Sequence, residues 1–349
     1  TIRSHALRGA VAELVYAALR RAIAYEPLLG TVPHAAGTVL LAAIERGLRP
    51  AVAIAATASA TDVASGALTA LARRLELAAG ETDDDDEPIE RFAARHAFPA
   101  WIAAELEATM DRTELAALFD ALNQRPPFSV RVNTAKTTVD EAAEALRREG
   151  LSVAAGARSP HALVVGRERD LFATEAFRTG LVEVQDEGSQ MVSLVTDPRP
   201  GERVLDLCAG SGGKTLHLGA LMRGRGEVFA YDTDQRRLAN ADRRVRRSGL
   251  QNVRLLRDAA SFAVFAERWR GRIDRVLVDA PCTGLGTVRR APDIKLRATP
   301  GLVDAMVARQ REVLATAVEF VRKGGRLVYA TCSILPRENE AAVAWLLAR

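Results

Sequence analysis

The second half of the chain alternates apolar, strand-like runs with helical patterns, and this alternation constrains the fold more than any other feature. It begins near Glu202 and is typical of a parallel sheet with helices on both faces. We therefore predict an α/β fold with a mostly parallel sheet. The predicted strands are Arg203–Leu207, Glu227–Tyr231, Val253–Arg257, Ile273–Asp279 and Gly325–Thr331.

A glycine-rich turn follows the first of these strands. The strand runs into Cys208-Ala209-Gly210-Ser211-Gly212-Gly213-Lys214-Thr215 and then into a helix. Glycines here let the backbone approach a ligand in the crevice where open α/β sheets bind cofactors. The next two strands end at Asp232 and Asp258, whose carboxylates can accept hydrogen bonds from ribose hydroxyls and an adenine amino group. These strand ends outline a pocket for a cofactor that contains adenosine.

Other interpretations of the turn stay open at this point. Gly210-Ser211-Gly212-Gly213 lacks the third glycine of the dinucleotide fingerprint, and no second mononucleotide-binding half follows, which argues against NAD. A P-loop is excluded because no glycine stands five positions before Gly213. The remaining alternative is a turn without a ligand, in which the two carboxylates only cap helices.

Two of the three cysteines follow strands of the same predicted sheet. One stands in Asp279-Ala280-Pro281-Cys282 and the other in Thr331-Cys332-Ser333. Each thiol therefore lies at the carboxyl end of a parallel strand, facing the cofactor crevice. An odd number of widely spaced cysteines argues against a disulfide framework and against a Cys-x-x-Cys metal site. We expect no metal, and we interpret Cys208 as a small, unreactive side chain in the turn.

The N-terminal part of the chain has a different, alanine-rich helical pattern. We predict helices over Leu7–Leu29, closed by Pro27, and over His34–Leu48 and Asp62–Leu77. The acidic run at residues 81–89 has no apolar residue before Pro88 to bury, which predicts a solvated linker, with an acidic partner-binding segment as the alternative. A compact α+β module ending near Arg178 should follow. Its predicted elements are helices Pro99–Met110, Thr113–Asn123 and Val139–Glu149 and strands Phe128–Asn133 and Ala162–Val165.

Net charge and hydropathy restrict the cellular location but do not identify the binding partner. The net charge of +4 and pI near 9.2 permit a polyanionic ligand, but nearly all the positive charge is arginine, and an excess of arginine over lysine can reflect genomic base composition as easily as phosphate binding. No apolar run reaches the roughly 20 residues of a membrane span, and the N-terminus lacks a signal-peptide layout. We expect a cytoplasmic, monomeric protein.

The paired cysteine motifs resemble those of the RsmB/Sun-type RNA cytosine-5 methyltransferases, which carry Asp-Ala-Pro-Cys and Thr-Cys-Ser in this order behind a Gly-Gly-Lys-Thr turn. The resemblance runs from about residue 90 to the end. Two positions depart from the family pattern: Gly210-Ser211 replaces Ala-Pro, and Leu296 replaces a tryptophan. Further matching segments are Gln124-Arg125-Pro126-Pro127, Arg131-Val132-Asn133, Val184-Gln185-Asp186, Ser189-Gln190 and Pro292-Asp293-Ile294-Lys295.

This resemblance implies a domain order. Residues 181–349 would form a Rossmann-type, S-adenosylmethionine-dependent methyltransferase domain, and residues 90–180 an α+β RNA-binding module. Residues 1–80 resemble a shortened NusB-like RNA-binding domain. Family members continue with two strands beyond the helix near Glu338, so we expect the last strands to be missing and Gly325–Thr331 to be an uncovered edge.

The resemblance also implies the chemistry, which is methylation of a cytosine at C5 in RNA, with small-subunit rRNA favoured by the NusB-like helices. Cys332 would attack C6, Cys282 would assist release, and Asp279 would bind the base edge. Lys214 would support Asp279 or neutralise a carboxylate, with a merely solvated lysine as the alternative. Arg289, Arg290 and Lys295 would grip RNA phosphates beside a flipped base. The cofactor-binding residues would be Cys208, Ala209, Gly210, Ser211, Gly212, Gly213, Lys214, Asp232, Asp258 and Asp279.

Other functions remain to be weighed against this one. A DNA cytosine-5 enzyme takes its nucleophile from the Pro-Cys motif alone, and protein N-methyltransferases favour an Asn/Asp-Pro-Pro-Tyr motif that is missing here. A non-catalytic RNA-binding or ribosome assembly factor would not need Cys282 and Cys332. Methylation of tRNA or another RNA stays possible.

Overall fold

A parallel sheet of five strands and an antiparallel sheet of four form the framework of the computed structural model, which describes residues 5–78 and 87–349. The chain forms two compact units. Unit 1 comprises Thr1–Pro126, Thr283–Val303 and Cys332–Pro336, and unit 2 comprises Pro127–Cys282, Asp304–Thr331 and Arg337–Arg349. Most of the predicted acidic linker, at residues 81–86, lies outside the described residues.

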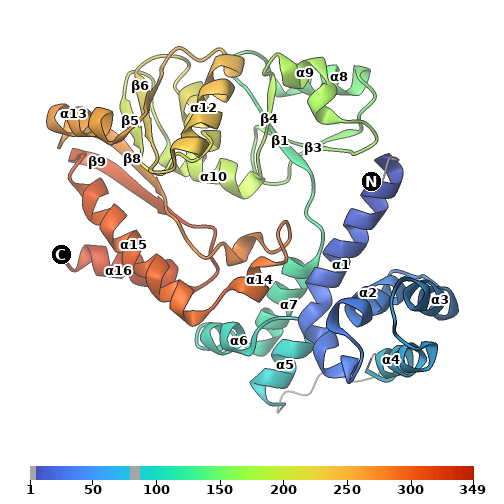
Figure 1. Ribbon diagram of the computed structural model, residues 1–349. Coiled ribbons are helices and arrows are strands. Elements are labelled where there is room, and N and C mark those ends of the chain that lie inside the picture. The colour runs from blue at the N-terminus through green and yellow to red at the C-terminus, as the bar shows by residue number, and fades with distance from the viewer. Residues whose placement is uncertain (1–4, 79–86) are drawn as a thin grey trace. The chain divides into compact units, whose positions relative to one another are not determined.

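Unit 2 contains both sheets and their helices (Figure 1). Two of its elements, α15 and η3, begin in unit 1 and end in unit 2. The elements are β1 (Ser129–Val132), α8 (Val139–Arg148), β2 (Val153–Ala155), β3 (Ala162–Val165), η1 (Leu171–Ala173), α9 (Glu175–Arg178), β4 (Val182–Val184), α10 (Glu187–Thr196), β5 (Arg203–Asp206), α11 (Gly213–Leu221), β6 (Glu227–Tyr231), α12 (Gln235–Ser248), β7 (Val253–Leu256), α13 (Ala259–Trp269), β8 (Ile273–Asp279), α15 (Pro300–Val318), β9 (Val321–Ala330), η3 (Pro336–Glu338) and α16 (Glu340–Leu347).

The five-stranded sheet has the order β7-β6-β5-β8-β9, and each adjacent pair is parallel. Successive strand residues point to opposite faces, so Val204 and Val228 pack with α10 and α11, whereas Leu205 and Phe229 pack with α13 and α15. Helices thus cover both faces, which explains the nearly continuous apolar strands. The predicted α/β fold is confirmed, and four of its strands agree with prediction to within one residue.

The antiparallel sheet has the order β2-β3-β1-β4 and packs against α8 and α9. Helix α8 begins at a capping box formed by Thr138 and Glu141, and its apolar face buries Leu146 in this core. Strand β4 extends the sheet past residue 178, where we predicted the module to end. Strands β2 and β4 have three residues each, too few for an alternating pattern to predict.

Unit 1 is helical. Leu40, Leu41 and Leu68 are fully buried in the core that α1, α2 and α4 share. The segments from the second half of the chain add η2 and α14 to this unit. Its elements are α1 (His5–Leu29), α2 (His34–Glu45), α3 (Pro50–Ala60), α4 (Ser65–Ala78), α5 (Ile89–Arg95), α6 (Ala100–Glu107), α7 (Arg112–Asn123), η2 (Leu285–Thr287) and α14 (Ile294–Arg297).

Three features of unit 1 differ from prediction. Pro27 lies inside the first helix and does not close it, although α1 ends at Leu29 as predicted; the missing proline N–H removes one hydrogen bond, while Leu29 stays buried in the core. Helix α3 was not predicted, since it is mostly alanine and buries fully only Ala53. Helices α5 to α7, which we predicted together with the α+β module, fall within unit 1, where the Arg21 side chain donates to the carbonyl of Arg95 in α5 at 3.2 Å.

The length and apolar composition of the described helices decide whether one of them could span a membrane. No single described helix is both long and apolar enough to cross a bilayer. Ala10–Leu29 and His34–Glu45 meet that length and composition test only as a joined pair, and they are bent by 112° at the break between them.

Candidate active site

The glycine-rich turn joins β5 to α11 at the carboxyl end of the parallel sheet. Gly210 and Gly212 both have positive φ, +53° and +80°, a backbone region that side chains disfavour. A Cβ on Gly212 would come within 2.9 Å of Ala241 in α12, so this glycine permits close helix packing. A Cβ on Gly210 would meet no described atom within 4 Å, so this part of the turn faces open space. Such a turn fits a cofactor approached closely by backbone.

Asp232 lies at the end of β6 and is tied to the same turn. Its Oδ2 accepts a hydrogen bond of 2.7 Å from the Gly210 amide, and its Oδ1 accepts one of the same length from the Asp234 amide. Each oxygen keeps a second lone pair for a ligand hydroxyl. The structure thus ties this carboxylate to the cofactor turn, and its contact with ribose hydroxyls remains a prediction.

Asp258 lies one strand further out, after β7, and caps α13. Its Oδ1 accepts from the Ser261 amide at 2.7 Å, and this hydrogen bond holds the pKa of the exposed carboxyl below its usual range. The capping role that we kept as an alternative thus applies to Asp258. Its contact with an adenine remains a prediction.

Asp206, which we did not assign to the site, is fully buried at the end of β5. Its Oδ2 accepts from Thr215 Oγ1 at 2.6 Å, and its Oδ1 is buried without a hydrogen-bond partner in the described part of the chain. Burial raises the pKa of this carboxyl to about 7, and the charges of Asp279 and Asp232 act in the same direction. An acid within an apolar strand was the sequence signal that could have identified it.

Lys214 and Asp279 form an ion pair between the turn and the end of β8. The Nζ···Oδ2 distance is 2.5 Å, and the two side chains are 15% and 31% exposed. The lysine is therefore ion-paired and not simply solvated, and its support of Asp279 in the reaction remains a prediction. Asp279 is paired in register with Ala330 of β9, and the Ala280 amide donates to the Ala330 carbonyl at 2.8 Å.

The two motif cysteines follow these adjacent strands, as predicted from the sequence. Cys282 is half-buried and Cys332 is exposed, and no disulfide involves either. The residues after them, Thr283 and Ser333, have hydroxyls 3.3 Å apart. Gly286, in the loop after Cys282, donates its amide to the Cys332 carbonyl at 2.8 Å. These two contacts fix the loops that follow the two cysteines to one another.

A buried glutamine supports the turn that precedes Cys282. Gln310 of α15 donates to the Pro281 carbonyl at 2.9 Å and to Glu338 Oε1 at 3.0 Å. Both Gln310 and Glu338 are fully buried. We did not predict this contact, since it joins three segments distant in sequence.

Cys208 differs from the other two thiols. It follows β5 and packs against one of the two sheet cores. Burial raises the pKa of its thiol above the ordinary value, which disfavours the reactive thiolate. This agrees with our interpretation of Cys208 as unreactive.

Another contact that we did not predict fixes the backbone of the cofactor turn. Arg244 of α12 donates through Nη1 to the Ser211 carbonyl at 2.9 Å, and through Nε to Glu183 of β4 at 3.1 Å. The Glu183 side chain is only 3% exposed. This arginine therefore links the antiparallel sheet to the cofactor turn, and among the many arginines of α12 no sequence signal distinguishes it.

The three predicted RNA-binding cations lie in unit 1, and one prediction is wrong. Lys295 is fully buried and donates to the Arg20 carbonyl and to Asn123 Oδ1, both at 2.7 Å, so it is not exposed to grip a phosphate. Arg289 donates to the carbonyls of Gln124 and Arg125 at 3.3 and 3.1 Å. Arg290 is half-buried.

No group of three or more potential metal-ligating side chains occurs among residues 5–78 and 87–349. The residues of the turn do fit S-adenosylmethionine. Gly210 leaves room for close approach, Asp232 offers lone pairs for ribose hydroxyls, and the Lys214–Asp279 pair presents both signs of charge.

Comparison with known sequences identifies two family regions. Residues 193–349 match the 16S rRNA methyltransferase RsmB/F family, and residues 98–171 match the RsmF/B-like ferredoxin-like domain. A relative in Synechocystis, named probable ribosomal RNA small subunit methyltransferase B, is 32% identical over 74% of this chain. A Sodalis glossinidius protein with the name ribosomal RNA small subunit methyltransferase B is 34% identical over 74%. The chain spans 58% and 59% of the lengths of these relatives.

Solved structures agree with this relationship. The crystal structure of PH0851 matches 99% of this chain and 82% of its own, with a TM-score of 0.78 and 28% identity. A methyltransferase homologue from Pyrococcus horikoshii matches 75% of this chain and 82% of its own, with a TM-score of 0.65 and 29% identity. The predicted methyl donor, S-adenosylmethionine, is confirmed at the level of the family. In its ferredoxin-like and catalytic regions, residues 98–171 and 193–349, this chain belongs to the RsmB/F family of rRNA methyltransferases.

Proposed function

We propose that this chain transfers a methyl group from S-adenosylmethionine to C5 of a cytosine in RNA, with small-subunit rRNA as the substrate class. The observation that carries the proposal is the position of Cys282 and Cys332 beyond the carboxyl ends of adjacent parallel strands, β8 and β9. Strand β8 is also paired with β5, which leads into the cofactor turn. The names of the relatives support an rRNA substrate.

The chemistry requires a temporary bond, because C5 of cytosine is a poor nucleophile. The Cys332 thiolate attacks C6, a sulfur–carbon bond forms, and the ring electron pair moves to C5. S-adenosylmethionine, when bound, supplies the methyl group. Cys282 then assists removal of the C5 proton, the 5,6 double bond is restored, and the Cys332 thiolate leaves. The exposure of Cys332 suits attack on a macromolecular substrate.

Asp279 binds the base in this scheme. Its carboxylate accepts a hydrogen bond from the exocyclic amine beside N3 and so orients the ring. Because Lys214 already holds one oxygen at 2.5 Å, the carboxylate keeps its position before the base arrives. The turn from Cys208 to Lys214, with Asp232, Asp258 and Asp279, holds the methyl donor. Arg289 and Arg290 remain proposed contacts for phosphates beside the target base.

Two alternative functions compete with this proposal. One is a non-catalytic RNA-binding or ribosome assembly factor, and the other is methylation of tRNA or another RNA. Retention of both thiols favours catalysis, because a scaffold without activity needs neither. We place the protein in the cytoplasm as a monomer, which size-exclusion chromatography with light scattering tests.

The test separates the two cysteines by the time at which each acts. Cys332→Ala should abolish transfer of tritiated methyl groups and form no adduct. Cys282→Ala should still allow attack, and so should accumulate an RNA–protein adduct that survives denaturant and shrinks on RNase digestion. A denaturing gel with radiolabelled small-subunit rRNA, run beside radiolabelled tRNA, reads both the adduct and the substrate class.

Cys208→Ala is the matched control, since this thiol lies outside the proposed chemistry and should trap no RNA. An adduct with the Cys332 variant in place of the Cys282 variant would reverse the two roles. Absence of any adduct and of methyl transfer by the unmodified protein would favour the non-catalytic alternative.

A further inference from the structure

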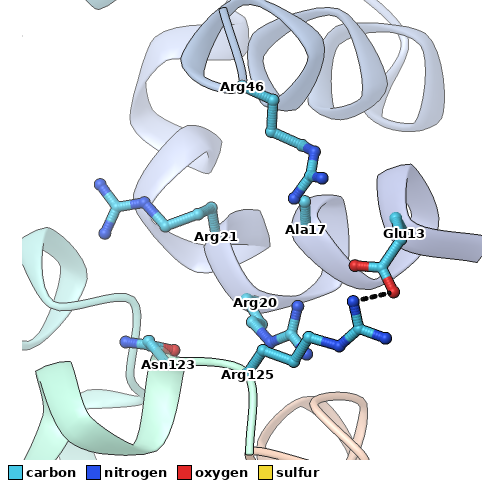
Figure 2. Close-up of a pocket in the computed structure, with 7 residues that line it drawn as sticks. All are labelled: Glu13, Ala17, Arg20, Arg21, Arg46, Asn123 and Arg125. Atoms are coloured by element: carbon cyan, nitrogen blue, oxygen red, sulfur yellow. Dashed lines mark ion pairs between the residues drawn. The ribbon is translucent and has the colours of Figure 1, made fainter. Parts of the chain in front are cut away.

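Unit 1 contains a hollow of about 380 Å³ that is lined mainly by arginine. This volume lies within the roughly 300–1,000 Å³ of typical ligand sites. Figure 2 shows the guanidinium groups of Arg20 and Arg125 beside one another and Arg46 reaching toward them from the end of α2. The lining residues are Glu13, Ala17, Arg20, Arg21, Arg46, Asn123 and Arg125.

The carboxylates at this hollow do not balance its positive charge. Glu13 pairs with Arg125 at 2.8 Å, and Glu45 lies 3.6 Å from Arg21. Arg46 forms no ion pair with any carboxylate that the structure describes, and Arg20 donates to a carbonyl, that of Arg289, at 3.3 Å. Glu13 also attracts Arg20, so this one carboxylate faces both Arg20 and Arg125. Within the described ranges, the four arginines of the hollow thus face only the carboxylates of Glu13 and Glu45.

Burial makes this imbalance costly. Arg20 Nε is buried and has no hydrogen-bond partner among the residues described. Desolvation lowers the pKa of Arg20; the charge of Glu13 opposes this, and the charges of Arg125 and Arg46 lower the pKa further. Lys295, which donates to the Arg20 carbonyl, has a pKa that falls to about 7 through burial and through the charges of Arg21 and Arg20. An anion in the hollow would relieve both the repulsion and the unpaired donor.

We propose that Arg20, Arg46 and Arg125 form a binding site for a phosphate of the RNA backbone, remote in sequence from the cysteine motifs. The inference rests on the proposed function for the identity of the ligand as RNA. Guanidinium groups bind phosphate oxygens through two parallel hydrogen bonds, and three of them from different elements can surround one phosphate. Glu13 then acts as an internal competitor, because its carboxylate occupies Arg125 until RNA displaces it.

This arrangement predicts opposite effects for neighbouring substitutions. Arg46→Ala should weaken binding of a fluorescein-labelled single-stranded RNA about tenfold and reduce the slope of log affinity against log salt by about one. Arg46→Lys should keep the slope while losing affinity, since the charge remains but the paired hydrogen bonds do not. Glu13→Gln should strengthen binding, because it removes the competing carboxylate and keeps the size of the side chain.

Arg73→Ala is the matched control, because Arg73 is an exposed arginine of the same unit that does not line the hollow. It should change neither the affinity nor the slope. Fluorescence anisotropy over a salt series measures all four variants in the full chain. An Arg46→Ala slope equal to that of the unmodified protein, or weaker binding by Glu13→Gln, would overturn the site.

Two further measurements separate this inference from the proposed function. If the proposed reaction and the phosphate site are both correct, Arg46→Ala raises KM for RNA and leaves kcat unchanged. If no methyl transfer occurs while the anisotropy results stand, the reaction is wrong and the phosphate site is right. Displacement of RNA by polyglutamate at equal charge concentration would instead assign the hollow to an acidic peptide and overturn the RNA phosphate.

Discussion

Replacement of Asp206 by asparagine should remove a pH dependence that this buried acid imposes on the stability of unit 2. The folded pKa is about 7, whereas the ordinary value is 3.8. A carboxyl whose pKa is raised by folding stabilises the fold fully below pH 4 and loses that contribution as the pH rises to about 7. The difference between 3.8 and about 7 is about three tenfold changes in proton affinity. Each corresponds to about 1.4 kcal/mol, so the free energy of unfolding should fall by about 4 kcal/mol. Asparagine does not titrate and can still accept the hydrogen bond of Thr215.

Urea unfolding followed by tryptophan fluorescence measures this difference. In a Trp101→Phe background the remaining tryptophans, Trp269 and Trp345, both belong to unit 2. Asp206→Asn should match its parent at pH 4 and exceed it in free energy of unfolding at pH 8. A difference that stays constant between these pH values would refute the reasoning.

Asp274→Asn is a control of opposite sign. Burial alone would raise the pKa of Asp274, but hydrogen bonds from the Arg203 amide and the Arg322 side chain lower it. The carboxylate therefore stabilises the fold above pH 4, and that contribution is lost as the pH falls. The Asp274→Asn variant should be less stable than its parent at pH 8 and approach it at acid pH.

Two more substitutions test contacts at the proposed active site. Asp232→Ala should weaken S-adenosylmethionine binding about tenfold or more in calorimetry, because a charged acceptor is lost. Asp232→Asn is the control, since it can still accept from the Gly210 amide; unchanged affinity of the alanine variant would contradict the assignment. Gln310→Leu should lower the free energy of unfolding by about 2–4 kcal/mol, because it leaves the Pro281 carbonyl and Glu338 without this donor. Unchanged urea unfolding would show that these groups find other partners.

The parallel sheet could be predicted because its strands are buried on both faces and therefore apolar throughout. Val204-Leu205 and Val276-Leu277 fill opposite faces of the sheet with adjacent residues. Helix α3 could not be predicted, since its alanines show no apolar face. The end of α1 at Leu29 agrees with the prediction, but Pro27 lies inside the helix and does not close it, because the burial of Leu29 outweighs the local effect of the proline.

The candidate site, like the fold, could be predicted only in part. Residues at strand ends, such as Asp232 and Asp279, could be predicted because parallel strands bring their carboxyl ends to one edge of the sheet. The burial of Lys295 could not be predicted, because sequence records a charge but not its burial, whereas Asp206 carried one usable signal, its position within an apolar strand. In the sequence, Lys295 resembles a surface cation. In the structure, its ammonium lies 4.5 Å from the centroid of the Phe98 ring and donates to two acceptors inside unit 1.

Strand register is the physical link between the fold and the proposed chemistry. The pairing of β8 with β9 begins at Ile273 and Val321, but the next pair is Arg275 and Arg326, so β9 carries extra residues at an irregularity. Gly324 and Gly325 lie within it; Gly324 has a φ of +72°, and a Cβ on Gly325 would come within 3.0 Å of two carbonyl oxygens. Without these glycines the strand could not take up the extra length. A shift of one residue would turn every side chain to the other face. The irregularity thus sets the pairing of Asp279 with Ala330, and through it the point at which the chain leaves the sheet toward Cys332.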